Sequence, residues 1–236
     1  MVEVKNVLFL DIETVALTQN FKSLDPALQT LWKKKCEFIR HPEGLTPDEI
    51  YEQRAGIYSE FGKIICIGVG KIFEEGGSLK LKTKAFAGDN ENSVLEEFKA
   101  MLVKTDQEKL MLCAHNGKEF DFPYICRRML INGISLPRCL DLSGKKPWEI
   151  KHLDTLEMWK FGDYKNYTSL DLLATIFQIP SSKEDINGSQ VNQVYYEEKN
   201  LEKIKDYCLR DVVVLTQLFL KMNGMETLHH DNITQA

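Results

Sequence analysis

Two acidic residues follow a short apolar segment near the start of the chain. Val7 to Leu10 is a run of apolar residues, typical of a strand that is buried on both faces of a sheet, and Asp11 and Glu13 come directly after it. Residues i and i+2 of a strand point to the same face, so these carboxylates should lie side by side and repel each other unless a cation neutralises them. The pair indicates either a metal site or a strand that has reached solvent.

Asp121 is a second candidate. It ends the segment Asn116-Gly117-Lys118-Glu119-Phe120-Asp121 and stands two residues before Pro123. Proline is well tolerated in the first turn of a helix, so the Asp121 carboxylate should lie at a helix N-terminus. This position is compatible with a metal ligand and also with an ordinary helix cap.

The third candidate is the pair Tyr207 and Asp211. Seven apolar residues at helical spacing predict a long helix with one buried stripe, and Tyr207 and Asp211 both fall on one border of that stripe. The two residues are one turn apart and share a face. A catalytic pair and a half-buried tyrosine–aspartate hydrogen bond are both compatible with this placement.

The periodicity of the chain predicts the elements that position these residues. Strands are expected near 7–10, 64–69, 79–86, 109–114 and 150–155, and helices near 93–102, 122–131, 170–177 and 200–222. The first three strands should form a meander. Residues 16–62 are predicted to be an insertion with helical fragments at 28–39 and 47–58, and 227–236 a polar, frayed tail in which His229 and His230 are solvated.

The three acidic segments together resemble the exonuclease motifs of DEDD nucleases. Asp11-Ile12-Glu13-Thr14, Asn116 to Pro123, and Tyr207-x-x-x-Asp211 occur in the order and approximate spacing of those motifs. The chain is similar to the DEDDy branch, and most of all to the proofreading domain of family B DNA polymerases, whose second motif also reads Asn-x-x-x-Phe-Asp. The DEDDh branch would have histidine where this chain has Asp206. The resemblance therefore favours a stand-alone DEDDy-type 3′–5′ exonuclease.

This resemblance implies an α/β fold of the RNase H-like class, in which a mixed sheet of about five strands is flanked by helices on both faces. We expect one exonuclease domain over 1–226. The resemblance also implies two divalent cations, Mg²⁺ or Mn²⁺, one held by Asp11, Glu13 and Asp211 and the other by Asp11 and, through water, Asp121. Tyr207 would orient the attacking water, and the products would be nucleoside 5′-monophosphates. Thr14 and Asn116 are expected to touch the terminal nucleotide or to brace the acids. Phe120 and Phe122 are candidates to stack on unpaired bases, while at least two of Phe120, Phe122 and Tyr124 are expected in the core.

Composition limits how such a chain could hold a polynucleotide. The formal net charge is −5, so any contact with nucleic acid must be local rather than due to an overall positive field. Arg127, Arg128, Lys145, Lys146 and Lys151 could form a phosphate path or be ordinary surface cations. The six cysteines lack the spacing of a zinc site, and no apolar run approaches the roughly 20 residues of a membrane helix, so we expect a cytoplasmic protein with reduced thiols.

The expected partner is single-stranded DNA or the 3′ end of a nucleic acid, with no membrane; protein partners are not predicted. Two alternatives remain open at this point. The same chemistry would serve a 3′–5′ exoribonuclease, because nothing in the motifs reads the sugar. The chain could also be a non-catalytic nucleic-acid-binding module on the same fold, which metal-dependent turnover would exclude.

Overall fold

The computed structural model describes residues 3–41, 44–163, 167–180 and 186–236. Its strands are β1 Val7–Ala16, β2 Gly62–Glu75, β3 Ser78–Ala87, β4 Met111–Ala114, β5 Leu153–Asp154 and β6 Ile233–Gln235. Its helices are α1 Pro26–Cys36, α2 Pro47–Arg54, α3 Glu91–Val103, α4 Asp121–Ile131, α5 Thr155–Lys160, α6 Leu170–Ile176, α7 Val191–Gln193, a π-helix Val194–Glu198 and α8 Leu201–Met222. Of the helices in these described ranges, none is long and apolar enough to cross a lipid bilayer.

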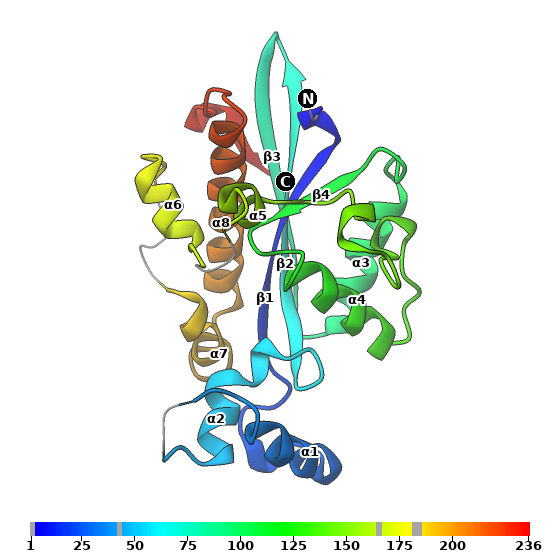
Figure 1. Ribbon diagram of the computed structural model, residues 1–236, viewed down its shortest axis with the longest axis vertical. Coiled ribbons are helices and arrows are strands. Elements are labelled where there is room, and N and C mark those ends of the chain that lie inside the picture. The colour runs from blue at the N-terminus through cyan, green and yellow to red at the C-terminus, as the bar shows by residue number, and fades with distance from the viewer. Residues whose placement is uncertain (1–2, 42–43, 164–166, 181–185) are drawn as a thin grey trace.

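The strands form one mixed sheet in the order β5-β4-β1-β2-β3-β6. The meander predicted for the first three strands is confirmed, because β1 pairs antiparallel with β2 and β2 antiparallel with β3. On the other side of β1, β4 and β5 pair in parallel. Helices α3 and α4 cover one face, and α8 with α6 lies on the other (Figure 1). The α/β class expected from the sequence is therefore correct.

Alternating residues of β1 contribute to two different cores. Leu8 and Leu10 pack in the cluster shared with α3 and α4, whereas Val7 and Phe9 pack in the cluster that contains Phe219 of α8. The continuous apolar run is therefore explained, because a central strand of a covered sheet has no wet face. The face on which a β1 side chain lies follows directly from whether its number is odd or even.

The last residues of the chain differ from their prediction. They were expected to fray, but Ile233 to Gln235 form β6, which pairs in parallel with β3 and is an edge strand of the sheet. Gln217 of α8 also donates to the Leu228 carbonyl and accepts from the Leu228 N–H, both at 2.8 Å. The sheet consequently has six strands rather than about five. A polar composition did not reveal this, because an edge strand can be held by backbone hydrogen bonds alone.

A buried ion pair joins α4 to α3, and the same arginine also binds the end of the insertion just before β2. Arg128 of α4 binds Glu91 of α3 through Nε at 2.9 Å and Nη2 at 2.5 Å, and its Nη1 donates to the Ser59 carbonyl at 2.9 Å. Glu91 also accepts from the backbone N–H of Ile64, next to a bulge in the β1–β2 register. Arg128, considered from sequence as a possible phosphate contact, is therefore a structural residue.

This ion pair supports a stability prediction. Glu91→Ala would leave the Arg128 guanidinium buried without its carboxylate, and we expect the free energy of unfolding to fall by about 3–5 kcal/mol. Glu96→Ala is the matched control on the same helix, because Glu96 is exposed and its ion pair with Lys99 should contribute no more than about 1 kcal/mol. Urea denaturation of both variants measures the difference, and equal stabilities would contradict the structural role.

Candidate active site

The row of β1 side chains that faces α8 contains two acids. Val7 and Phe9 pack on the α8 side, Val15 continues the same row, and Asp11 and Glu13 lie between them. Glu13 is buried and Asp11 half-buried. The strand therefore does not simply reach solvent after Leu10, which was the alternative explanation of this pair. Two carboxylates instead stand in an otherwise apolar row under a helix.

Two glycines of β2 allow α8 to lie close to this row. Gly68 is the register partner of Asp11, and a Cβ at Gly68 would come within 2.8 Å of the Cys208 Sγ and 3.1 Å of the Val212 Cγ2. At Gly70 a Cβ would lie 2.8 Å from the Val212 Cγ1. Because these positions carry no side chain, the Cys208 thiol reaches within 3.4 Å of the Asp11 Oδ2. The glycines thus set the depth at which α8 packs beside the acids.

We expect Gly68→Ala to disturb this packing. The added methyl group meets a thiol and a branched side chain of a long helix, so the overpacking should lower the free energy of unfolding by about 1–3 kcal/mol. Gly88→Ala is the control, since a Cβ there would come no nearer than 3.6 Å to the atoms around it. Thermal and urea unfolding of the two variants test this, and a Gly68→Ala protein as stable as wild type would show that α8 does not need the glycine.

Asp121 approaches β1 from the side of β4, the edge of β1 that does not pair with β2. It is the first residue of α4 and is 4% exposed. The pairing of β4 with β1 covers only Val7 to Phe9, so beyond Phe9 β4 no longer covers this edge of β1. Burial raises the pKa of Asp121 to about 7, although hydrogen bonds from its own backbone N–H and from that of Ile12 act in the opposite direction. Asp121 therefore lies against the backbone between Asp11 and Glu13.

The long helix α8 supplies the remaining acid and the phenol. Asn200 caps its first turn by accepting from the Lys203 N–H at 3.0 Å. Tyr207 and Asp211, 8% and 9% exposed, lie one turn apart, and the phenol hydrogen-bonds to the Asp211 carboxylate. Burial raises the pKa of Tyr207, and the negative charges of Asp211, Glu13 and Asp11 raise it further. The phenol is consequently neutral at physiological pH.

The carboxyl groups destabilise one another's charged forms. Burial raises the pKa of Asp11 well above its ordinary value, and Asp211 and Asp121 raise it further. The pKa of Glu13 is raised in the same way, first by burial and then by Asp11 and Asp211. Such mutual repulsion is relieved when a divalent cation binds.

The available ligand atoms suit a hard cation. Asp11, Glu13 and Cys208 place one possible ligand atom each within 4.8 Å of one another. Burial raises the pKa of the Cys208 thiol well above its ordinary value, and a neutral thiol is a poor ligand for a hard cation such as Mg²⁺. The donors that remain are carboxylate oxygens, which Mg²⁺ and Mn²⁺ prefer. The residues present therefore fit the cations implied by the sequence motifs.

The residues expected to touch substrate differ in how far they are buried. Phe122 is 0% exposed and packs in the core of α3 and α4, so its expected contact with a nucleotide is wrong. Phe120 is half-buried, with its ring 5.3 Å from that of Tyr124. The hydroxyl of Thr14 donates to the Gly56 carbonyl at 2.8 Å. Of the aromatics in this motif, the position of Phe120 is the one still compatible with substrate contact.

Asn116 has a backbone role that the sequence did not reveal. It adopts a left-handed conformation with φ of 63°, and its N–H donates to the Asp154 carboxylate at 2.9 Å. The same carboxylate accepts from the N–H groups of Lys118 and Leu156 at 3.0 and 2.9 Å. Asp154 thus ties the loop before Asp121 to the start of α5. The Asn116 side chain is half-buried and remains a candidate for substrate contact.

Tyr167 is an aromatic residue near the acids that the sequence motifs did not indicate. Its side chain is 66% exposed, and its ring packs edge-on against His115 with centroids 6.3 Å apart. Burial of its hydroxyl raises the pKa of Tyr167, and the charge of Asp121 contributes next. Tyr167 precedes the cap residue Ser169 and belongs to no periodic segment. Only the packing of Tyr167 against His115 brings this residue toward the acids.

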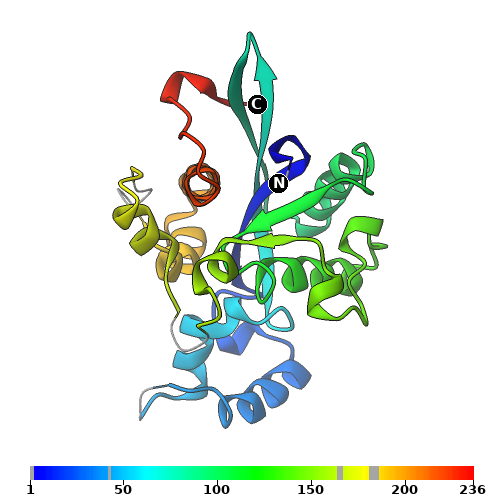
Figure 2. The same cartoon turned by 45° about the horizontal axis from the view of Figure 1, so that its top comes forward.

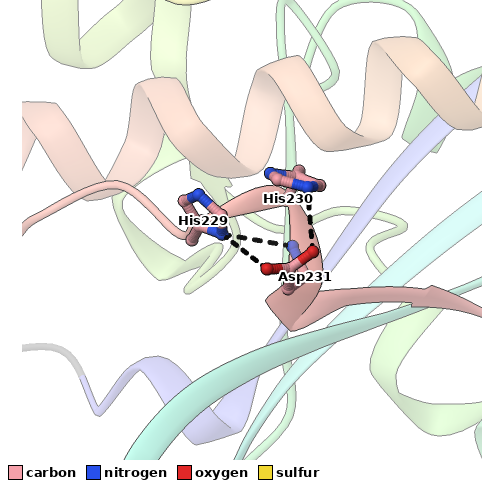
Figure 3. A group of neighbouring side chains, drawn as sticks. All are labelled: His229, His230 and Asp231. Carbon is pink, nitrogen blue, oxygen red and sulfur yellow. Dashed lines mark hydrogen bonds and ion pairs between the residues drawn. The ribbon is translucent and has the colours of Figure 1, made fainter.

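A second group of possible metal ligands lies apart from these acids, at the C-terminal turn before β6. The Nδ1 of His229 and the Nε2 of His230 each contact the Asp231 carboxylate, at 3.2 and 2.8 Å (Figure 3). All three residues are exposed, in agreement with the solvated positions expected for the two histidines. An imidazole-rich, exposed group suits Zn²⁺ or Ni²⁺ better than Mg²⁺, so it does not compete with the carboxylate site for that cation.

Comparisons with known proteins point in the same direction as the motifs. The family B DNA polymerase of the hyperthermophilic archaeon Pyrobaculum calidifontis has a similar structure, with a TM-score of 0.57 and 16% sequence identity over 91% of this chain and 24% of that chain. The chain thus spans about a quarter of that polymerase, and at this identity the similarity shows the fold alone. No curated protein matches the sequence. Residues 57–235, well over half of the chain, match a family profile, and the chain therefore belongs to the family of predicted 3′–5′ exonucleases related to the exonuclease domain of PolB.

Proposed function

We propose that this chain is a metal-dependent 3′–5′ exonuclease that releases nucleoside 5′-monophosphates from the 3′ end of single-stranded DNA. The observation that carries the proposal is the convergence of four acids from three separate elements: Asp11 and Glu13 of β1, Asp121 of α4 and Asp211 of α8. Asp11 and Glu13 precede the residues matched by the family profile, so this convergence is independent support.

In this proposal Asp11, Glu13 and Asp211 would hold one divalent cation, and a second would be held by Asp11 and, through water, by Asp121. Such cations lower the pKa of water and stabilise negative charge on a departing 3′ oxygen. The chain's own contribution is to hold four carboxylates in a buried place where, without cations, they repel one another. The backbone N–H of Ile12 keeps Asp121 turned toward β1.

Tyr207 acts as a positioning phenol. Its O–H is engaged by the Asp211 carboxylate, which leaves the oxygen lone pairs free to accept a hydrogen bond from the attacking water. A neutral phenol does not add to the negative charge around the phosphate. The exposed ring of Tyr167 is suited to stack on the base of the terminal nucleotide, the role that Phe122 cannot fill.

Incubation of 5′-labelled single-stranded DNA with Mg²⁺ or Mn²⁺ tests the proposal directly. We expect a ladder of shortened products that EDTA abolishes and that Asp211→Asn does not produce. Chain-matched RNA in the same assay separates the exoribonuclease alternative, which faster RNA digestion would favour. A wild-type protein inert with either metal on either substrate would support a non-catalytic binding module instead.

The form of the substrate gives a further expected result. A linear single strand and a duplex with a 3′ overhang should both be shortened, whereas a circular single strand of the same sequence should persist, because a circle offers no 3′ end. The three substrates are compared at equal nucleotide concentration on a denaturing gel. Efficient cleavage of the circle would indicate endonucleolytic attack and contradict the proposal.

A further inference from the structure

The insertion after β1 builds a small core of its own. Trp32 of α1 is fully buried, its ring lies 5.4 Å from that of Tyr51 and 4.9 Å from that of Phe61, and its Nε1 donates to the Pro47 carbonyl at 2.9 Å. The family match begins at residue 57, so α1 lies outside it. Because one face of α1 is anchored through Trp32, the opposite face has a defined direction.

The exposed side of α1, together with the turn that follows it at 37–40, is basic and carries exposed apolar side chains. Residues 26–40 contain Lys33, Lys34, Lys35 and Arg40 but only one acid, Glu37, in a chain with a net charge of −5. Lys33, Lys34 and Arg40 are exposed, and the Lys33 Nζ also lies 5.8 Å from the centroid of the Phe21 ring. Within the described residues neither Lys33 nor Lys34 has an ion-pair partner. Leu31 and Phe38, one on either side of the lysines, are 52% and 87% exposed. We call Lys33, Lys34, Phe38 and Arg40 the α1 patch.

The insertion is fixed relative to the strand that carries the acids. Both the Thr14 hydroxyl and the Tyr124 phenol donate to the Gly56 carbonyl at 2.8 Å. The N–H of Ala16 donates to Asn192 at 3.0 Å, and its carbonyl accepts from the Tyr196 phenol at 2.7 Å. In both views α1 and α2 lie beyond the carboxyl end of β1, the end toward which Asp11 and Glu13 stand (Figures 1 and 2). The α1 patch therefore has a fixed place on the active-site end of the sheet.

We propose that the α1 patch binds the single-stranded polynucleotide upstream of its 3′ end, with Lys33, Lys34 and Arg40 on phosphates and Phe38 stacked on a base. Exposed cations next to an exposed aromatic ring are the combination that binds single strands without reading sequence. The choice of occupant rests on the proposed function. The patch supplies a local positive field that the chain as a whole lacks. Because it lies away from the acids, only a strand long enough to extend from the active site to the patch can contact both.

The experiment compares Lys33→Gln/Lys34→Gln and Phe38→Ala with the control Lys82→Gln/Lys84→Gln on β3. These residues are exposed, so thermal unfolding should show that all variants fold. Anisotropy with labelled 4- and 20-nucleotide single strands in EDTA measures Kd over a salt series. For the longer strand we expect the lysine variant to reduce the magnitude of the slope of log K, the association constant, against log salt by about 1.4, at about 0.7 per phosphate contact. Phe38→Ala should weaken binding of the same strand roughly 5- to 150-fold.

Turnover with Mg²⁺ separates the two proposals. Patch variants should lose kcat/KM on the 20-nucleotide strand and keep the wild-type rate on the 4-nucleotide strand. Unchanged Kd and salt slope for the longer strand would overturn the patch while leaving the exonuclease intact. If wild type cleaves neither strand, the exonuclease proposal fails, and the anisotropy still decides whether the patch binds nucleic acid. The patch proposal would also be overturned if the lysine variant lost no more affinity than the β3 control.

Discussion

Asp11→Asn is expected to lower the rate of DNA hydrolysis by about 10³-fold or more, because losing a bridging ligand removes Lewis acidity that contributes several kcal/mol. The same change should stabilise the metal-free protein. Asp11 is surrounded by Asp211 and Asp121, and its pKa is raised well above the ordinary value by burial and by those charges. An amide of the same shape removes the repulsion. Loss of activity together with gain of stability is the signature of a metal site rather than of a structural acid.

The sign of the pH dependence follows from the raised pKa values of Asp11 and Glu13. Between their ordinary and raised pKa values the folded protein binds more protons than the unfolded chain, so the contribution of these groups to stability falls as pH rises through that interval. Urea denaturation in EDTA at pH 5 and pH 8 should show this loss in wild type, and a smaller loss in Asp11→Asn. Saturating Mn²⁺ should restore wild-type stability at pH 8, by about 2.7 kcal/mol at 100 times Kd.

Asp206→Asn is the matched control for this experiment. Asp206 is an exposed acid of α8 next to Tyr207, so the same chemical change should leave turnover, the pH dependence and the Mn²⁺ effect close to wild type. If Asp11→Asn retained both activity and the full stabilisation by Mn²⁺, Asp11 would not be a metal ligand. If Asp206→Asn lost activity as strongly as Asp11→Asn, the effect would be due to net charge and not to the site.

Tyr207→Phe is expected to reduce single-turnover hydrolysis by about 10²–10⁴-fold while leaving the affinity for Mn²⁺ unchanged. The variant keeps the ring and loses the hydroxyl that binds Asp211, so the free energy of unfolding should change by no more than about 1.5 kcal/mol. Asp211→Asn should weaken both hydrolysis and Mn²⁺ binding, because it removes a ligand. Isothermal titration with Mn²⁺ beside single-turnover kinetics distinguishes the two kinds of residue.

Tyr195→Phe provides the comparison for the lost hydrogen bond. The Tyr195 phenol donates to the Asp89 carboxylate at 2.9 Å, away from the four acids, so its removal changes a similar bond without touching the site. The control should hydrolyse DNA at the wild-type rate. A fully active Tyr207→Phe protein would make Tyr207 a packing residue and remove the feature that assigns the chain to the DEDDy branch.

Local periodicity predicted the pairs of residues that lie within one element. Alternation along a strand placed Asp11 and Glu13 on one face, and the helical repeat placed Tyr207 one turn from Asp211; both arrangements are present in the structure. The N-caps at Ser169 and Asn200 are of the same local kind, because capping depends on a side chain and a backbone group three residues away. Short-range geometry of this kind does not depend on the rest of the fold.

Contacts between elements were decided by tertiary structure alone. The sequence indicated that at least two of Phe120, Phe122 and Tyr124 belong to the core but not which two, since burial depends on what packs against a residue and not on its type. Tyr167, the Gly68 contact with Cys208 and the sixth strand likewise arise from segments distant in sequence. By itself, the sequence determined that Asp11 and Glu13 share one face of β1 and that Tyr207 and Asp211 share one face of α8. Only the fold brought Asp121 to the backbone of Ile12 and α8 down onto β2, because nonlocal packing sets those distances.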